Sequence, residues 1–410
     1  MSDLPWPPLG KHIIQFCIAS DQLEPNYIAA MQWHPRQVCI LSSGLPRIIA
    51  AAKRLQAAFH HAEIPAEVLE IPDGEPARLR DFAKKLVMTM RELDQDVHLM
   101  LNATGGKKVM SMAFAQAFEQ AGNASVIYVD SEQRQIYTLF PHHAASFPIE
   151  ENLITIDAAL ALRGFVKCSS ASDLKEWRDA ATARSALSHQ LLQQSDALRH
   201  FLRYMNRAAA ETQDIAQGAQ LLRDREWLNS AEQSILQALN TRQLASYDST
   251  RQTIHFASQE ARRYLGGQWL EEYTWLAVRN FAHADHSQCS LKVASQDKRA
   301  MDNEVDVLLA AENRLLIVEC KTGNLSYGDK GNDALYRLDW LKQHLGGYYA
   351  DTILLSLRPL DTPVAQRAQE MRALVLTGHQ ILHLETLVSR WLKRESYESL
   401  NSWIHTLGAP

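Results

Sequence analysis

Residues 303–321 read NEVDVLLAAENRLLIVECK, and this stretch decides the fold that we expect at the carboxyl-terminal end of the chain. Its apolar runs predict two adjacent strands joined by a short turn, 305–310 and 314–320. Side chains two positions apart on a strand point to the same face, so Glu319 and Lys321 emerge together. Asp306, near the start of the first strand, can be brought beside them. The stretch therefore predicts two carboxylates and a lysine at one edge of a sheet.

Converging carboxylates are ligands for a hard divalent cation such as Mg²⁺ or Mn²⁺. Such a metal polarises a phosphoryl oxygen and lowers the pKa of a bound water, while a lysine positions that water or stabilises developing charge. The alternative is an exposed ion pair between Glu319 and Lys321, worth about 0 to 1 kcal/mol. The preceding Asp306 and the apolar strands favour an active site for phosphodiester hydrolysis.

Asp306, the hairpin spacing and Glu319-Cys320-Lys321 resemble the PD-(D/E)xK nuclease family. The resemblance implies that Asp306 and Glu319 hold Mn²⁺ or Mg²⁺, that Lys321 assists catalysis, and that the first helix supplies another acidic metal ligand. Residues 266–273, GGQWLEEY, offer two candidates. Glu271 is the first choice, because it directly follows the Trp-Leu pair of the family's GxWLE-like pattern. Glu272 stays open, since one residue along a helix turns the side chain by about 100°.

The amino-terminal part alternates apolar strand patterns with helical ones, which predicts a Rossmann-like α/β domain with a largely parallel sheet. The expected strands are 13–19, 38–41, 66–71, 97–101 and 125–129, and the expected helices are 46–61, 75–93 and 107–121.

The segment 102–108, NATGGKK, follows a predicted strand and begins a predicted helix. This arrangement presents backbone N–H groups and the positive end of a helix dipole to a phosphate. The segment is neither a GxGxxG nor a P-loop motif, so neither hydride transfer nor ATP hydrolysis is indicated. Further polar loops follow two earlier strands at the same sheet edge. The candidate ligand-binding residues are Ala19, Ser20, Asp21, Ser42, Ser43, Gly44, Asn102, Thr104, Gly105, Gly106, Lys107 and Lys108.

This domain resembles the CARF domains of CRISPR-associated proteins, and the NxTGGxK loop is the most specific element of the resemblance. Lys108 matches the family lysine, whereas Lys107 replaces a residue that is usually Thr or another small one. The resemblance implies that a homodimer binds a cyclic oligoadenylate. The two resemblances together imply an ancillary nuclease of type III CRISPR systems, activated by cyclic tetra-adenylate, which we favour over hexa-adenylate.

We expect three parts: a sensing domain at 1–156, a helical connector at 157–257 and a nuclease domain at 258–410. Residues 173–225 and 235–244 predict helices and 252–256 a strand, so a winged-helix module is an alternative for the connector. A mixed α/β core is expected in the nuclease domain, with helices at 268–281, 333–344 and 363–376 and a further strand at 352–357.

The net charge of −5 excludes a generally basic nucleic-acid coat, so nucleic acid would be held by a local patch. The five cysteines form no CxxC pair, which argues against a zinc site and a disulfide framework. Neither a signal peptide nor an apolar run of about 20 residues is present in the sequence, so we expect a cytoplasmic protein without a membrane segment.

Two other functions stay open at this point. The chain could be a ligand-responsive nucleic-acid-binding regulator with an inactive nuclease fold, although Asp306, Glu319 and Lys321 are all intact. The sensing domain could also be a ring nuclease that degrades the cyclic oligoadenylate. The sequence leaves open whether single-stranded DNA, duplex DNA or RNA is the substrate.

Overall fold

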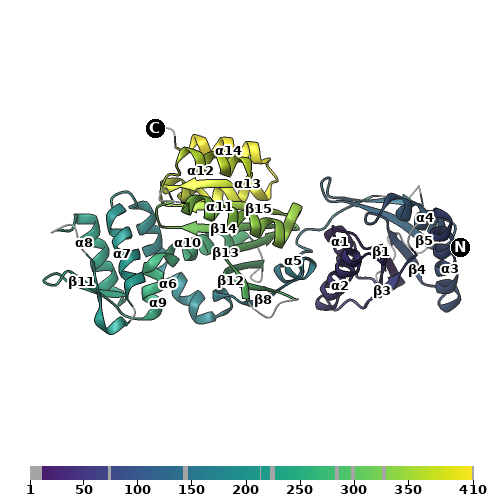
Figure 1. Ribbon diagram of the computed structural model, residues 1–410, viewed down its shortest axis with the longest axis horizontal. Coiled ribbons are helices and arrows are strands. Elements are labelled where there is room, and N and C mark those ends of the chain that lie inside the picture. Colours follow the sequence, from purple (N-terminus) through teal and green to yellow (C-terminus); the bar gives the residue numbers. More distant parts are fainter. Residues whose placement is uncertain are drawn as a thin grey trace. The chain divides into compact units, whose positions relative to one another are not determined.

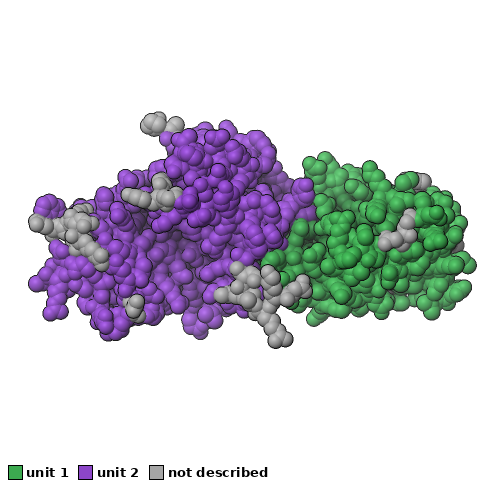
Figure 2. All heavy atoms as spheres, viewed as in Figure 1, with its two compact units in different colours: residues 1–166, 295–297 green, residues 167–294, 298–410 purple. Residues whose placement is uncertain are grey.

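The computed structural model describes residues 12–72, 75–141, 146–212, 214–221, 227–281, 286–296, 301–325 and 329–408. Contacts between Cα atoms divide the chain into two compact units (Figure 2). Unit 1 comprises residues 1–166 and 295–297, and unit 2 comprises residues 167–294 and 298–410.

Unit 1 contains a seven-stranded sheet in the order β3-β2-β1-β4-β5-β6-β7. The first five strands are parallel, and β6 and β7 continue the sheet antiparallel. The strands are β1 (Ile13–Ile18), β2 (Gln37–Ser42), β3 (Ala66–Glu70), β4 (His98–Asn102), β5 (Ala124–Asp130), β6 (Gln135–Phe140) and β7 (Phe147–Pro148). The helices are α1 (Glu24–Trp33), α2 (Pro46–His61), α3 (Pro76–Leu93), α4 (Lys108–Glu119) and α5 (Ile156–Arg163).

The strand order of unit 1 reverses between β1 and β4, because the chain first builds outward to β3 and then returns to the other side of β1. Helices α3 and α4 cover one face, where Phe16 and Phe118 pack edge to face with ring centroids 5.2 Å apart. On α1 and α2, Tyr27 stacks on Phe59. The carboxyl ends of β1 and β4 thus meet at a topological switch point, where ligands of open α/β sheets bind.

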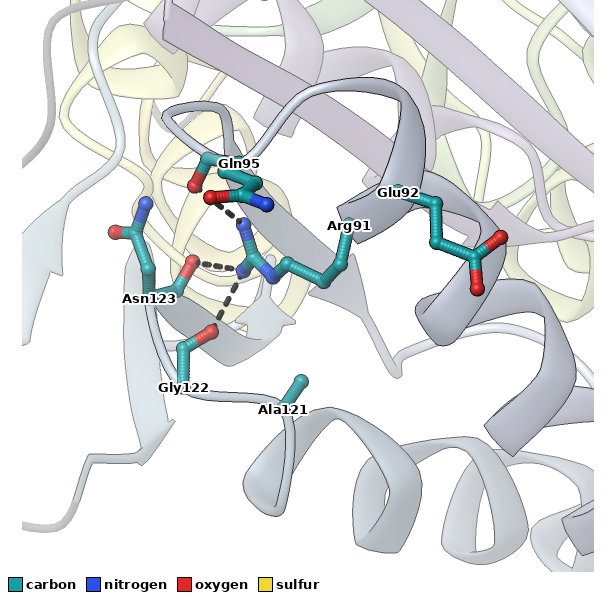
Figure 3. A pocket seen from close by; sticks show the side chains of 6 residues that line it. All are labelled: Arg91, Glu92, Gln95, Ala121, Gly122 and Asn123. Carbon is teal, nitrogen blue, oxygen red and sulfur yellow. Dashed lines mark hydrogen bonds between the residues drawn. The ribbon is translucent and has the colours of Figure 1, made fainter.

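Arg91, near the end of α3, forms hydrogen bonds with the turns that precede β4 and β5, at the end of the strands opposite the switch point (Figure 3). Its guanidinium donates hydrogen bonds to the carbonyls of Val97 at 2.6 Å and of Gly122 at 2.6 Å. A shallow hollow of about 420 Å³ lies beside it. Because β4 and β5 begin here, the Arg91 contacts stabilise the edge remote from the switch point.

Unit 2 is built on a six-stranded mixed sheet in the order β16-β15-β14-β13-β12-β8. β12, β13 and β14 are antiparallel, whereas β14, β15 and β16 are parallel. The strands are β8 (Phe165–Ser169), β12 (Ser287–Ser295), β13 (Met301–Ala311), β14 (Arg314–Lys321), β15 (Ala350–Ser356) and β16 (Leu374–Thr377). Its helices are α6 (Lys175–Gln193), α7 (Arg199–Glu211), α8 (Ser230–Thr241), α9 (Gln259–Arg263), α10 (Trp269–Val278), α11 (Lys330–Leu341), α12 (Thr362–Glu370), α13 (Leu384–Leu392) and α14 (Tyr397–Thr406).

Helices cover both faces of this sheet (Figure 1). α10 and α13 pack on one face, where Trp269 and Val318 belong to the same buried cluster, and α11 packs on the other against β14 and β15. The hairpin turn between β13 and β14 places Glu312 and Asn313 at φ of 55° and 57°. Two such residues are typical of a tight turn that matches the twist of the flanking strands.

The helical segment after unit 1 shares its hydrophobic core with the six-stranded sheet of unit 2. Leu187 of α6, Phe201 of α7 and Ile235 of α8 lie in one buried cluster with Val318 of β14. A small antiparallel sheet combines β9 (Ala219–Gln220), which precedes α8, with β10 (Ala245–Asp248) and β11 (Thr253–Phe256), which follow it. The helix expected at 235–244 and the strand expected at 252–256 are present as α8 and β11, and both belong to unit 2.

Several expected elements differ from the structure. The predicted helix 363–376 is wrong in its second half, because α12 ends at Glu370, Arg372 adopts a φ of 54°, and β16 follows. Residues 173–225 are not helical throughout, since β9 lies within them, and residues 213 and 222–226 are outside the described part. The sequence analysis did not predict the strands β6, β7, β8, β10, β12 and β16.

Candidate functional site

The hairpin of β13 and β14 brings Asp306, Glu319 and Lys321 together. The antiparallel register runs from Ala311 opposite Arg314 to Val307 opposite Val318. Immediately beyond it, the backbone N–H of Cys320 donates to Oδ2 of Asp306 at 2.8 Å. Lys321 Nζ lies 2.5 Å from Oε1 of Glu319 and 3.8 Å from Oδ2 of Asp306. The ammonium group therefore lies between the two carboxylates that the sequence singled out.

Glu319 is fully buried, and only one of its two carboxylate oxygens has a partner. Oε1 receives Lys321, whereas Oε2 has no hydrogen-bond partner in the structure. Burial and the neighbouring carboxylate of Asp306 raise the pKa of Glu319, while Lys321 acts in the opposite direction. A buried carboxylate oxygen without a donor is unfavourable unless a cation is bound nearby, because burial penalises the charged form.

Two adjacent glutamates on α10 have different environments. Glu271 accepts a hydrogen bond of 2.9 Å from Ser290 Oγ on β12. Burial, followed by the negative charge of Asp306, raises the pKa of Glu271 to about 8. The carboxyl group of Glu271 thus lies close enough to Asp306 to sense its charge, as expected for a site residue from the first helix.

Glu272 lies within a different network. Its carboxylate forms two hydrogen bonds with the Arg184 guanidinium of α6, at 2.8 and 3.1 Å, and Arg184 also reaches Glu260 at 2.7 Å. Burial raises the pKa of Glu272 to about 7 despite these bonds. For Arg184, burial acts to lower the pKa, but the two glutamates outweigh it and raise the pKa. Glu272 therefore fastens α10 to α6, and Glu271 is the glutamate that faces the hairpin.

The structure adds three residues to this site to which the sequence analysis assigned no role. Nη1 of Arg337, on α11, lies 3.4 Å from Oε1 of Glu319, and its Nη2 donates to the carbonyl of Glu304 at 2.7 Å. Glu304 also contributes to the raised pKa of Glu271, to which Ser290 donates its hydrogen bond. Glu304 stands two positions before Asp306 on β13, a signal that was available in the sequence. Arg337 follows the strand of Glu319 and Lys321 in the sequence, where substrate would enter, but only the packing of α11 brings it to Glu319. No sequence signal placed Ser290, because it acts across the fold.

The carboxylate oxygens of this site are suitable ligands for a divalent cation. The acidic oxygens around Asp306, Glu319 and Glu271 are the ligand type that Mg²⁺ and Mn²⁺ prefer, and the unpartnered Oε2 of Glu319 is one of them. The described residues contain no group of three or more His, Cys, Asp or Glu side chains already gathered as a metal cage. Lys321 lies between two of the carboxylates, so a cation would take its place beside Glu319 and Asp306 only if the ammonium shifts.

In unit 1, the predicted glycine loop lies at the switch point between β1 and β4. Asn102 is buried; its Nδ2 donates to the carbonyl of Pro25, and its Oδ1 accepts from Thr104 N and Oγ1. Thr104 Oγ1 in turn accepts the N–H of Val129. The side chains of Asn102 and Thr104 thus form hydrogen bonds within the protein that shape the loop. Contact of these two residues with a ligand stays a prediction.

The two glycines of the loop have little room for a side chain. A Cβ atom at Gly105 would lie 2.1 Å from the carbonyl oxygen of Ile18, and one at Gly106 would lie 2.4 Å from Ile18 Cγ2. Gly106 also has a φ of +82°, which residues other than glycine rarely adopt. The backbone of the loop therefore packs directly on β1, with Lys107 and Lys108 exposed beside it.

A hollow of about 140 Å³ lies at this edge. The structure brings six of the candidate ligand-binding residues to its walls: Ala19, Ser20, Asp21, Ser43, Gly106 and Lys107. Of the other candidates, Ser42 is buried at the end of β2, Gly44 is exposed in the next bend, and Lys108 begins α4. Arg47, which the sequence analysis did not include, also lines the hollow and forms an ion pair of 3.2 Å with Asp21.

Family models match both of these regions. Residues 14–158 match a Card1 CARF domain, and residues 258–395 match a Card1-like endonuclease domain. The chain joins a CARF domain to a Card1-like endonuclease domain. The resemblances stated from the two motifs are confirmed by these matches.

Several solved structures align with most of this chain. Protein VC1899 from Vibrio cholerae aligns with a TM-score of 0.79 and 21% identity over 93% of this chain and 98% of that one. Can2 from Sulfobacillus thermosulfidooxidans, solved with cyclic tetra-adenylate, aligns with a TM-score of 0.70 and 22% identity over 93% and 99%. A type III CRISPR defence DNA nuclease activated by cyclic oligoadenylate aligns with a TM-score of 0.53 and 16% identity over 88% and 48%. At sequence identities this low, the structural alignments establish the fold alone.

A search of curated proteins gave no match to the CARF-endonuclease chain. Among the residues that the structure describes, none of the helices has the length and apolar character needed to cross a membrane.

Proposed function

We propose that this protein is a metal-dependent endonuclease of type III CRISPR defence that a cyclic oligoadenylate activates. Cyclic tetra-adenylate is the favoured activator, and a homodimer is the favoured assembly. The substrate is DNA or RNA, cut by phosphodiester hydrolysis.

The observation that carries the nuclease proposal is the buried carboxylate of Glu319. Its Oε2 lacks a partner although Lys321 and Arg337 both approach Oε1. Asp306 lies next to it, with Oδ2 fixed by the N–H of Cys320. We propose that Asp306, Glu319 and Glu271 hold Mn²⁺ or Mg²⁺. When bound, the metal supplies Lewis-acid polarisation of the phosphoryl oxygen and a more acidic water.

The side chains of the endonuclease domain have distinct parts in this proposal. Lys321, with its ammonium beside both carboxylates, orients the attacking water and stabilises negative charge on the phosphoryl group. Burial acts to lower the pKa of Lys321, but Glu319 and Asp306 outweigh it and raise the pKa, so the side chain stays charged at neutral pH. Glu319 stands on a buried strand between β13 and β15, which holds its carboxylate in a fixed orientation.

The observations that support an anionic activator lie in the CARF domain. The hollow at the switch point is lined by loop residues and by two cationic side chains, Lys107 and Arg47. Gly105 and Gly106 have no side chain and let the loop backbone pack directly on Ile18 of β1, beside the hollow. Can2, which has the same fold, was solved with cyclic tetra-adenylate. For activation, the ligand must bind one conformation of the protein more tightly than the other, since only differential affinity shifts an equilibrium.

The test is cleavage by the purified full-length protein in Mn²⁺, with labelled single-stranded DNA, supercoiled plasmid and RNA, each with and without cyclic tetra-adenylate or hexa-adenylate. Glu319→Ala is the inactive control. We expect ligand-dependent cleavage that disappears in the variant and on chelation of the metal. Cleavage without ligand would remove the activation proposal, and an absence of cleavage with retained ligand binding would favour a regulatory binding protein. Chromatography of the incubated ligand tests for ring cleavage.

A further inference from the structure

Arg337 connects α11 to both strands of the site hairpin. Its Nη2 donates to the carbonyl of Glu304 on β13, and its Nη1 lies 3.4 Å from Oε1 of Glu319 on β14. α11 follows β14 in the chain, and its buried residues pack on β14 and β15. The guanidinium is therefore held at the level of the carboxylates by an element outside the hairpin.

Neutralising Glu319 does not require this arginine, because Lys321 already lies 2.5 Å from the same oxygen. The side chain of Glu319 is 0% exposed, whereas that of Arg337 is 39% exposed. Of the two cationic side chains beside Glu319, Arg337 is therefore more exposed to solvent than Lys321, which is 29% exposed.

The chemistry of the guanidinium suits a phosphodiester. It is planar, always charged and carries five N–H donors in a fork that matches the oxygens of a phosphate. The hydrogen bond to the Glu304 carbonyl already restricts the side chain, so less rotamer entropy is lost when the remaining donors bind an anion. Net charge is negative over the whole chain, so a local cation at the site has to provide the attraction for nucleic acid.

We propose that Arg337 is a substrate-contacting residue of the endonuclease site, whose guanidinium binds a backbone phosphate of the nucleic acid beside Asp306 and Glu319. This inference rests on the proposed nuclease function and names a residue that recognises its substrate. Contact with a phosphate gives affinity without base preference, because it carries no sequence information.

The experiment measures binding of nucleic acid separately from its cleavage. Full-length protein with cyclic tetra-adenylate is titrated with fluorescein-labelled single-stranded DNA, duplex DNA and RNA in Ca²⁺, over a series of KCl concentrations. Arg337→Met removes the charge and keeps the aliphatic stem, and Arg337→Lys keeps the charge without the fork. The matched control is Arg372→Met, since Arg372 is a surface arginine of the same unit, 57% exposed and paired with Glu398.

We expect Arg337→Met to weaken binding about tenfold, as for the loss of a charge-assisted hydrogen bond. The slope of log K against log salt should fall by about 0.9 for duplex DNA or about 0.7 for a single strand. Arg337→Lys should keep the slope and lose less affinity, and Arg372→Met should match the unchanged protein. Mn²⁺ binding to Arg337→Met, followed by electron paramagnetic resonance, should be retained.

Two results would overturn the proposal. Unchanged affinity and salt slope in Arg337→Met, with reduced cleavage, would make Arg337 a structural strap on Glu319. Loss of Mn²⁺ binding in the same variant would show that it acts through the carboxylates. If the unchanged protein neither binds nor cleaves any of the three nucleic acids, the nuclease function itself fails, which differs from a defect confined to the Arg337 variants.

Discussion

Exchanging each of the two adjacent glutamates of α10 for glutamine should separate activity from stability. Burial raises the pKa of Glu271 to about 8 from its ordinary 4.5. Because the folded pKa is the higher one, Glu271 destabilises the fold increasingly as pH rises from 4.5 to 8, by at most about 3 kcal/mol at pH 7. Glu271 is partly exposed, so solvent screening reduces this figure. Glu271→Gln should therefore unfold no more easily than the unchanged protein, while cleavage falls by more than about 100-fold through loss of a metal ligand.

Glu272→Gln should have the opposite outcome. It breaks a buried ion pair whose side chains are 8% and 3% exposed. The cost should be about 1 to 3 kcal/mol, because Arg184 keeps Glu260 and the raised pKa of Glu272 means that burial already opposes its charged form. Cleavage per folded molecule should stay within a few-fold of the unchanged protein. Urea unfolding followed by the fluorescence of the buried Trp269 and Trp275, together with cleavage in Mn²⁺ and cyclic tetra-adenylate, measures both quantities. A fully folded but inactive Glu272→Gln beside an active Glu271→Gln would refute this assignment.

The CARF domain offers three further predictions. Gly106→Ala should weaken binding of cyclic tetra-adenylate, measured by calorimetry, by about tenfold, since the new Cβ would meet Ile18. The control is Gly122→Ala, where φ is +60° and the space is open, and its binding should be unchanged. Equal binding by both variants would contradict the role of the loop. Burial lowers the pKa of His98, so the unfolding free energy should fall as pH drops below about 6.5, where the unfolded histidine gains its proton; the same pH profile in His98→Gln would disprove that origin. Arg91→Met should reduce the melting temperature, because the loss of its hydrogen bonds to backbone carbonyls costs about 2 to 4 kcal/mol (Figure 3). Ligand affinity should be retained, because these bonds lie where β4 and β5 begin, away from the switch point. Weaker binding at full stability would contradict this placement.

Much of the fold could be predicted because local patterns agreed with the tertiary context. The five parallel strands of unit 1 are apolar runs between amphipathic helices, and the structure places them within a few residues of the prediction. β16 was predicted as helix, because Leu374–Leu376 is too short a run to have a recognisable period. β12 was missed, since it is recognisable as a strand only through its pairing with β13.

The sequence by itself determined which groups are available for chemistry: Asp306 before an apolar strand, Glu319 and Lys321 two apart on the next, and a glycine loop after β4. These follow from strand alternation and turn chemistry, which are local properties of the backbone. Only the tertiary structure decided between Glu271 and Glu272, since that choice depends on Arg184, 88 residues away from Glu272. It likewise brought Arg337 and Ser290 to the site, because such contacts are set by the packing of helices on the sheet rather than by neighbours in the chain.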